Sequence, residues 1–287
     1  MEGSLGMAMK QHARWFCAAA GLVLGAQAWG QTTTWTLSTA TVSSGNYVAS
    51  GVGGTPNAPP SATASAWANT GSGNDTGGGT LERQSATANF VQYSGGVGIN
   101  NLDGCSSGTT CDVGDLANTQ PEHAIDNQQR YEMVLLNFAA PVNLTKATTG
   151  WTGTDADFTV LAYSPGGSSA PSLAGQTWSA LTVASGWNLI GNYSFSPNRT
   201  SGSETVTFAN STYSSSWLIG ALNPLVSSNV GKLGLDTSSD YFKLISVFGC
   251  SAANCPSQTG GAPEPGSIAL LASALVGMFG VSRRRKT

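Results

Sequence analysis

Residues 122–165 read EHAIDNQQRYEMVLLNFAAPVNLTKATTGWTGTDADFTVLAYSP and decide the fold. Arg130–Phe138 is mostly apolar from Met133 to Leu136, as expected for a strand that is buried on both faces or lies at a sandwich core. Pro141–Ala147 and Asp157–Tyr163 alternate between side-chain types with the period of two residues that is typical of strands. The block therefore predicts three successive β-strands.

Outward from this block, short apolar runs alternate with turns rich in Gly, Ser and Asn. We expect further strands at Gln31–Leu37, Phe90–Ile99 with a glycine break, Trp187–Phe195, Glu204–Phe208, Trp217–Leu222 and Tyr241–Phe248. This spacing predicts an all-β fold, an antiparallel β-sandwich of jelly-roll or immunoglobulin-like type with long polar loops. Residues 43–79 are low in complexity, and we expect a long loop or irregular decoration there, anchored by Trp67.

Charge is scarce in the body of the chain, which we take as residues 29–261. It holds six basic and thirteen acidic side chains, a net charge of −7. Phosphate binding requires clustered Lys and Arg, so this balance argues against nucleic acid as a partner. A composition rich in Ser, Thr, Gly and Asn, with scattered Trp and Tyr, is typical of extracellular β proteins.

The cysteines of the body fall into two close pairs, Cys105 with Cys111 and Cys250 with Cys255. An even number of cysteines in an exported chain indicates disulfides, and local pairing is the simplest of the three possible arrangements. Neither pair has the CxxC spacing of a zinc site, and the body has one His, so we expect no metal there.

The N-terminus resembles a cleaved secretory signal. Lys10, His12 and Arg14 form a basic region, and Trp15–Leu24 is apolar. A small-x-small cleavage box follows, in which Ala26 and Ala28 flank Gln27. We therefore expect residues 1–28 to be a signal peptide that directs the body through the Sec translocon.

The C-terminal stretch 262–287 combines three features in a fixed order. The acidic tripeptide Pro263, Glu264 and Pro265 comes first, and prolines on both sides disfavour helix at this carboxylate. Ile268–Val281 is an uncharged run with helical composition, short for a bilayer span. A basic cluster then acts as a stop-transfer signal that stays cytoplasmic, and it consists of Arg283, Arg284, Arg285 and Lys286.

These three features resemble the PEP-CTERM sorting domain of Gram-negative bacteria. The resemblance implies recognition of the Pro-Glu-Pro motif by an exosortase, a membrane-embedded enzyme that would cut nearby and release or re-attach the protein outside the cell. It also implies a transient intermediate in the inner membrane, followed by the cell surface or the extracellular matrix. The pattern His123–Asn127, HAIDN, before an apolar strand is similar to one common in PEP-CTERM proteins.

Candidate catalytic chemistry centres on Glu122, His123 and Asp126, which could serve as acid, base and orienting group. They lie within five residues before a strand, where a turn explains them as well. We favour the turn, with Asp126 and Asn127 bonding the backbone and His123 packing at the start of the strand. We therefore expect no catalytic residues and a protein that is not an enzyme.

Two groups of carboxylates suit Ca²⁺, because its ligands are oxygens from loops. One group surrounds the first cysteine pair, and the other is Asp155 with Asp157. The first group comprises Asp103, Asp112 and Asp115. Neither matches an EF-hand, so we expect no cofactor, with Ca²⁺ as the alternative.

Aromatic side chains could stack on sugar rings, or they could fill the core, which takes most aromatics. The candidates are Trp151, Trp178, Trp187, Trp217, Tyr163, Tyr193 and Tyr213.

The leading interpretation is an exported surface or matrix protein with a structural or adhesive role in the exopolysaccharide layer of a biofilm. The alternative is a carbohydrate-binding module, assisted by calcium.

Overall fold

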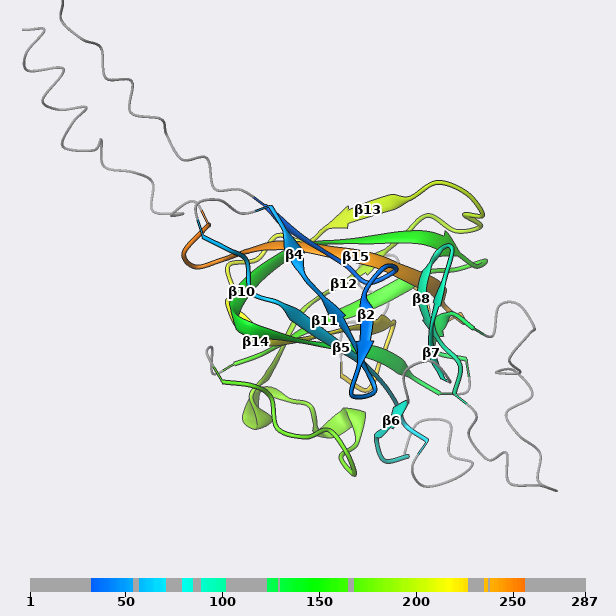
Figure 1. The fold of residues 1–287 in the computed structure, drawn as a ribbon. Coiled ribbons are helices and arrows are strands. Elements are labelled where there is room, and N and C mark those ends of the chain that lie inside the picture. The colour runs from blue at the N-terminus through cyan, green and yellow to red at the C-terminus, as the bar shows by residue number, and fades with distance from the viewer. Residues whose placement is uncertain are drawn as a thin grey trace, which may run out of the picture.

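The computed structural model describes residues 32–53, 57–70, 79–84, 89–101, 123–128, 130–164, 168–226, 235–236 and 238–255. Within these ranges the chain forms a 15-stranded sheet and two short 3₁₀ helices (Figure 1). Each pair of neighbouring strands in the sheet runs antiparallel, as in β1 with β15 and in β10 with β14. The prediction of an all-β, antiparallel body is confirmed, while the jelly-roll or immunoglobulin-like assignment stays a prediction.

The strands begin near the start of the body and continue to its last described turn. In chain order they are β1 (Thr33–Thr36), β2 (Thr41–Ser43), β3 (Asn46–Ala49), β4 (Gly51–Val52), β5 (Ala62–Ala68), β6 (Glu82–Gln84), β7 (Phe90–Tyr93), β8 (Gly96–Ile99), β9 (Ile125–Asp126), β10 (Glu132–Thr152), β11 (Asp157–Tyr163), β12 (Trp187–Ser194), β13 (Glu204–Thr207), β14 (Ser214–Ala221) and β15 (Tyr241–Ser251).

The 21-residue strand β10 organises the sheet. Its first half pairs with β5 and β14, and its second half pairs with β15 and β13. The change of partners follows a register shift between Asn137 and Val142, where Pro141 lies. Proline has no N–H to donate to a ladder, so within a sheet it is confined to edges and bulges. The two strands expected at Arg130–Phe138 and Pro141–Ala147 are therefore one irregular strand.

The other long strand, β15, is the second hub of the sheet. It pairs with β10 and β1, and more briefly with β8 and β9. The main path of the sheet runs β12-β11-β14-β10-β15-β1-β4. Strands from both ends of the body therefore lie side by side, with Thr33 opposite Gly249.

The sheet encloses one large apolar core. Side chains from ten strands meet there with almost no exposure, among them Trp35, Phe90, Phe158, Trp217 and Phe242. Aromatic pairs link the strands, such as Phe158 stacked on Phe195 with ring centroids 4.4 Å apart. Aromatic pairs of this kind add stabilisation beyond the burial of their area.

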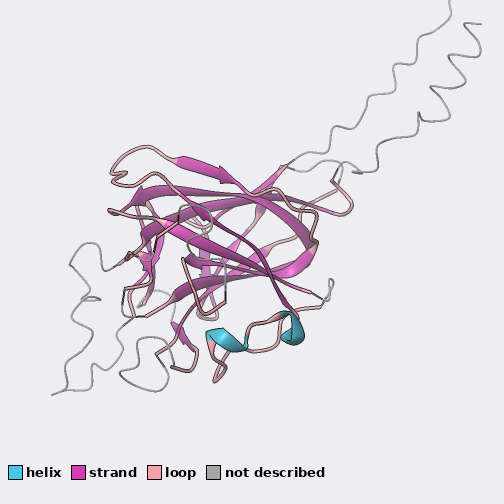
Figure 2. Cartoon of the chain, turned by 180° about the vertical axis from the view of Figure 1, so that it is seen from behind, coloured by secondary structure: helices cyan, strands magenta, loops and turns pink. Residues whose placement is uncertain are grey.

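A second apolar cluster lies on the opposite face of β10, β11 and β14. The segment that carries the 3₁₀ helices η1 (Trp178–Ala180) and η2 (Val183–Ser185) covers this face (Figure 2). Trp178 is fully buried, and its indole N–H donates to the carbonyl of Tyr131 over 3.0 Å. Strand β10 is therefore covered on both faces, as its apolar run predicted.

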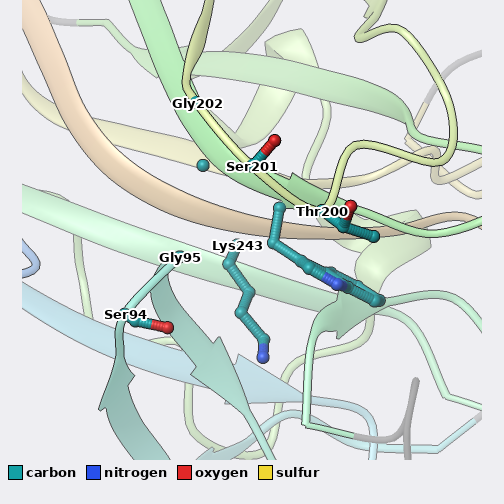
Figure 3. Close-up of a pocket in the computed structure, with 8 residues that line it drawn as sticks. Ser94, Gly95, Thr200, Ser201, Gly202 and Lys243 are labelled. Atoms are coloured by element: carbon teal, nitrogen blue, oxygen red, sulfur yellow. The ribbon is translucent and has the colours of Figure 1, made fainter.

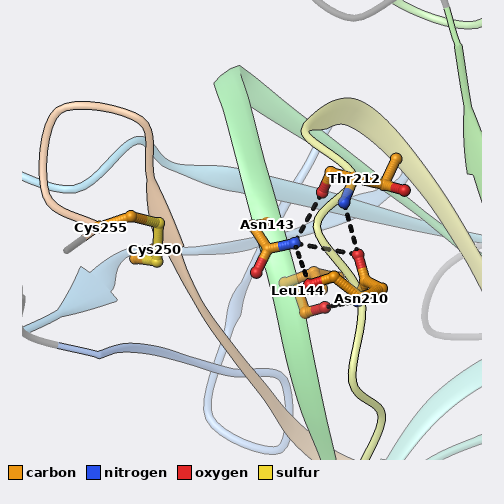
Figure 4. Close-up of a disulfide and its surroundings, with 6 residues drawn as sticks. All are labelled: Asn143, Leu144, Asn210, Thr212, Cys250 and Cys255. Carbon is orange, nitrogen blue, oxygen red and sulfur yellow. Dashed lines mark hydrogen bonds between the residues drawn. A yellow bond between two sulfur atoms is a disulfide. The ribbon is translucent and has the colours of Figure 1, made fainter. Parts of the chain in front are cut away.

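A disulfide closes the end of β15. Cys250 and Cys255 are bonded, with their Cα atoms 5.2 Å apart (Figure 4). The amide of Asn143, opposite Cys250, donates to the carbonyls of Asn210 and Thr212 and to the Asn210 side chain. The local pairing predicted for these cysteines is confirmed, while Cys105 and Cys111 lie outside the described residues.

The expectation of a loop over residues 43–79 is wrong where the structure describes it. Strands β3, β4 and β5 lie in this segment, and β5 pairs with β10 over its whole length. The sequence ATASAWA of β5 has little intrinsic strand preference, but three of its alanines are buried in the apolar core. Strand formation depends on context more than on composition, and here pairing with a buried strand decides the outcome.

The expected signal peptide, with Ala26 and Ala28, and the expected tail helix lie outside the described residues. Within the part that is described, no helix has the length and apolar character needed to cross a bilayer. The domain boundaries at residues 28 and 261 therefore stay predictions.

Candidate functional site

A pocket of about 460 Å³ opens where four segments of the sheet meet. The β7–β8 turn, the end of β10, the β12–β13 loop and β15 all contribute to it. Its principal lining residues are Ser94, Gly95, Trp151, Thr200, Ser201 and Lys243. Figure 3 shows Lys243 between Ser94 and Gly95 on one side and the Thr200–Gly202 loop on the other. We call this the Trp151 pocket.

Lys243 is the charged group of this pocket. It lies opposite Trp151 in the β10–β15 ladder, and the residue is only 5% exposed. Its ammonium lies 4.3 Å from the ring centroid of Tyr93 and 5.0 Å from that of Trp151. Burial lowers the pKa of Lys243 to about 8, because desolvation disfavours the charged form. At neutral pH the group is therefore still mostly a cation, held against aromatic faces.

The β12–β13 loop is tied to the end of β10. The Thr152 N–H donates to the Arg199 carbonyl over 3.0 Å, and the Arg199 N–H donates to the Thr152 hydroxyl over 2.9 Å. The Arg199 guanidinium also pairs with Glu204 at 3.3 Å. These contacts hold the hydroxyl groups of Thr200 and Ser201 at the exposed rim of the pocket.

Three carboxylates gather where the chain passes from β10 to β11 and enters β15. Asp155 and Asp157 flank the start of β11, and Asp240 directly precedes β15. One ligand oxygen from each lies within 4.8 Å of the others. Asp157 and Asp240 are buried, whereas Asp155 is half-buried. We call these residues the acidic cluster.

Hydrogen bonds fix Asp240 within this cluster. The N–H of Asp157 donates to Oδ1 of Asp240 over 2.7 Å, and the side chain of Asn127 donates to Oδ2 of Asp240 over 2.6 Å. Asn127 in turn accepts from the N–H of Asp240 over 2.7 Å. The HAIDN segment therefore clamps a residue 113 positions away.

Burial disfavours charge on the cluster. It raises the pKa of Asp240 to about 8, and the negative charges of Asp157 and Asp155 act in the same direction. Desolvation also raises the pKa of Asp155 and of Asp157. Either a retained proton on Asp240 or a divalent cation would relieve this repulsion, and carboxylate oxygens suit Ca²⁺. Among the described residues, these three carboxylates form the group that could hold a metal ion.

We expect the free energy of unfolding to fall as the pH rises from about 4 to about 8. Folded Asp240 keeps its proton up to a pKa of about 8, whereas the unfolded carboxyl loses it near 3.8. The folded state then binds more protons across this window, so stability decreases with pH. The lowered pKa of Lys243 acts in the other direction, but only above pH 8. Thermal unfolding in a chelator at several pH values measures the profile.

Asp240→Asn should flatten this profile, because it removes the titrating group and keeps the shape of the side chain. Glu82→Gln is the matched control, since Glu82 is exposed on β6 and takes no part in the acidic cluster. Equal pH profiles for wild type and Asp240→Asn would contradict the assignment. Added Ca²⁺ that raises the unfolding temperature of the wild type but not of Asp240→Asn would place the ion in the acidic cluster.

His123 lies at the start of the HAIDN segment, with its ring centroid 4.5 Å from that of Tyr93. Asp126 is fully buried, and its Oδ1 accepts the N–H of Gln128 over 3.0 Å, as in a turn. The structure therefore provides the turn that the sequence favoured. The Asn127 side chain also bonds backbone groups, as expected, but they are the carbonyl of Leu222 and the N–H of Asp240 across the fold, and it donates to the Asp240 side chain as well. Glu122 lies outside the described residues.

The aromatic candidates separate into core and pocket residues. Trp178, Trp187 and Trp217 are at most 1% exposed and fill the two apolar clusters. Tyr163 and Tyr193 pack against these clusters, and Tyr213 is half-buried. Among the four tryptophans considered, Trp151 alone is part-exposed and lines the pocket.

Sequence reasoning identified Trp151, Asp155 and Asp157 but missed Lys243 and Asp240. One signal for both was available in the stretch DYFKLISVF, residues 240–248, where a carboxylate precedes an apolar strand and a cation interrupts it. A charge in a buried strand requires a partner or a function. The carboxylates Asp103, Asp112 and Asp115 lie outside the described residues.

The described chain is thus an antiparallel β protein with a polar pocket and a neighbouring group of carboxylates. Its tail matches the family model of the PEP-CTERM protein-sorting motif over residues 262–286. The chain therefore carries that motif, which marks an exosortase-targeted surface protein exported through a membrane-associated processing step. The match covers the tail and not the β body. No curated protein and no solved structure is detectably similar to the chain.

Proposed function

We propose that the chain is a non-enzymatic surface protein with a structural or adhesive role in the exopolysaccharide layer of a Gram-negative biofilm. The observation that carries the proposal is the sorting motif at residues 262–286, downstream of the β body. In this proposal Pro263, Glu264 and Pro265 are read by the exosortase, and Arg283–Lys286 stop translocation. The protein passes through the inner membrane as an intermediate.

Features of the body support this role. The net charge of −7 over residues 29–261 keeps it soluble outside the cell without favouring nucleic acid. The antiparallel sheet with a well-filled core and a disulfide suits a protein that must persist in an oxidising environment. The ring contact of His123 with Tyr93 and the turn at Asp126 favour a structural use of the HAIDN segment.

The test compares a host that has its exosortase with the same host lacking that enzyme. We expect the protein at the cell surface or in the matrix of the first host, and in the inner membrane of the second. Cell fractionation and surface labelling measure the distribution. Matrix mass and cell adhesion in a strain without the protein test its role there, and an unchanged matrix would contradict the structural role.

A second candidate function is glycan binding, and the Trp151 pocket favours it. Ligand pockets of about 300–1,000 Å³ with a few convergent polar groups are typical of small-molecule sites. This pocket offers an aromatic wall, hydroxyl groups at the rim and one cation. Ca²⁺ at the acidic cluster, just along the same strands, is the ion we propose to assist such binding.

A further inference from the structure

We propose that the Trp151 pocket binds a sugar residue that carries a carboxylate, a uronic acid unit of an acidic polysaccharide. The inference rests on the glycan-binding function proposed above and adds the charge of the ligand. It follows from three features of the pocket, which are an ammonium that no described residue provides with a counter-charge, an aromatic wall and a rim of hydroxyl groups.

The first feature is the ammonium of Lys243. Lys243 as a residue is only 5% exposed, and a charge on a side chain so largely removed from water is costly unless an opposite charge or hydrogen bonds compensate it. Among the described residues, none provides Lys243 with a carboxylate or a hydrogen bond to its Nζ. The two aromatic faces at 4.3 and 5.0 Å stabilise the cation only in part. An anionic ligand would supply the missing charge through a charge-assisted hydrogen bond.

The second feature is Trp151 itself. Its ring is part-exposed, and it contributes to the wall of the pocket. The rigid aromatic surface offers a large apolar area, which the C–H face of a sugar ring can cover. A free inorganic anion has no apolar face and would make no use of this wall. The combination of Trp151 with Lys243 therefore selects a ligand with both an apolar face and a negative group.

The third feature is the arrangement of the rim. Ser94, Thr200 and Ser201 are exposed and carry hydroxyl groups that can donate to or accept from sugar hydroxyls. Because the loop with Thr200 is tied to Thr152, these groups are held in place before a ligand arrives. Preorganisation lowers the entropic cost of binding. An open rim also leaves room for a chain to continue beyond the bound residue.

Glycine makes the floor of the pocket possible. The N–H of Gly150 donates to the Gly95 carbonyl over 3.1 Å, which brings the β7–β8 turn against β10. A Cβ at Gly95 would lie 2.7 Å from the Cβ of Trp151, and one at Gly150 would lie 2.8 Å from the Gly95 oxygen. Side chains at these positions would clash and displace Trp151. The two glycines therefore set the position of the aromatic wall.

The acidic cluster does not cancel the positive charge of the pocket. Asp240 precedes Lys243 by three residues along an extended chain, a separation of roughly 10 Å at about 3.3 Å per residue. Its two carboxyl oxygens accept hydrogen bonds from the N–H of Asp157 and from the side chain of Asn127, within the acidic cluster. The cation that faces the ligand is therefore Lys243, with Arg199 already paired with Glu204.

The test uses the full chain in detergent and two forms of one ligand, a galacturonic acid trisaccharide and its methyl ester. Esterification removes the negative charge and keeps the sugar. We expect the acid to bind at least tenfold more tightly than the ester, by calorimetry. Lys243→Met should abolish that difference, and Trp151→Ala should weaken both ligands. Lys146→Met is the matched control, because it removes an equal charge from β10 outside the pocket.

The outcomes distinguish a failure of the acidic-sugar proposal from a failure of the glycan-binding function on which it rests. Equal binding of acid and ester by the wild type overturns the choice of an acidic sugar and leaves glycan binding standing. This comparison needs no variant, so a failure of Lys243→Met to fold does not affect it. If Lys146→Met abolishes the difference in affinity between acid and ester as Lys243→Met does, the proposal is also overturned. The preference would then depend on the net charge of the protein and not on the pocket. If neither trisaccharide nor a neutral glucan binds, both proposals fall, and sorting by the exosortase is unaffected.

Discussion

Glu264→Ala should abolish processing while export and membrane insertion continue. Prolines on both sides disfavour helix, so we expect the carboxylate to be accessible to an enzyme in the membrane. Without the carboxylate the motif loses the charged group that we propose the exosortase recognises. The protein should then accumulate in the inner membrane at its longer, tail-bearing mass. Intact mass and membrane fraction, measured in a host with its exosortase, check the result.

Two controls sharpen this experiment. Glu82→Ala removes a carboxylate from the exposed edge of the body and should be processed normally. A variant with neutral residues in place of Arg283, Arg284 and Arg285 should have a different defect. It should weaken the stop-transfer signal and leave recognition of the Pro-Glu-Pro motif intact. If Glu264→Ala is processed and released like the wild type, the tail is a membrane anchor and the sorting argument fails.

Trp217→Ala should cost about 3–5 kcal/mol of stability, the range for removing a buried large aromatic side chain. Trp217 is fully buried at the centre of the sheet, where β14 lies between β10 and β11. Its indole N–H also donates to the Ser214 carbonyl over 3.1 Å. Because domains are stable by only about 5–15 kcal/mol, the loss would be a large share of the total. Chemical denaturation measures it.

Trp151→Ala is the matched comparison, since the same side chain is removed from a part-exposed site at the pocket. We expect less than half of the cost of Trp217→Ala, because less area returns to water and no closed cavity forms. An equal decrease in the free energy of unfolding for the two variants would mean that Trp151 is a core residue. Its side chain would then not be available as the aromatic wall of the pocket.

The apolar and alternating runs at residues 130–163 predicted the central strands well, because burial leaves a direct pattern in sequence. The pattern did not show that two of these strands are one. Pro141 suggested a break, but it lies at a bulge inside β10, where a missing N–H is tolerated. The alanine-rich β5 was also missed, since its strand character comes from pairing with β10 and not from its own residues.

The candidate sites show the same limit. Asp155 and Asp157 are neighbours in sequence and could be found together, but Asp240 joins them from 83 residues beyond Asp157. Likewise, Trp151 was a candidate among seven aromatics until burial separated it from Trp178, Trp187 and Trp217. Contacts between distant strands are set by register, and register was not visible in local patterns.

The position of β15 has a consequence for the time at which the body can fold. This last strand pairs with β10 and, through Thr33 opposite Gly249, with the first strand. Such long-range pairing delays folding, since loop closure must precede the contacts that reward it. A chain exported N-terminus first would lack β15, the second hub of the sheet, until residue 251 had crossed the membrane. We therefore expect the body to complete its sheet only after β15 has crossed, shortly before the sorting motif at residues 262–286 follows.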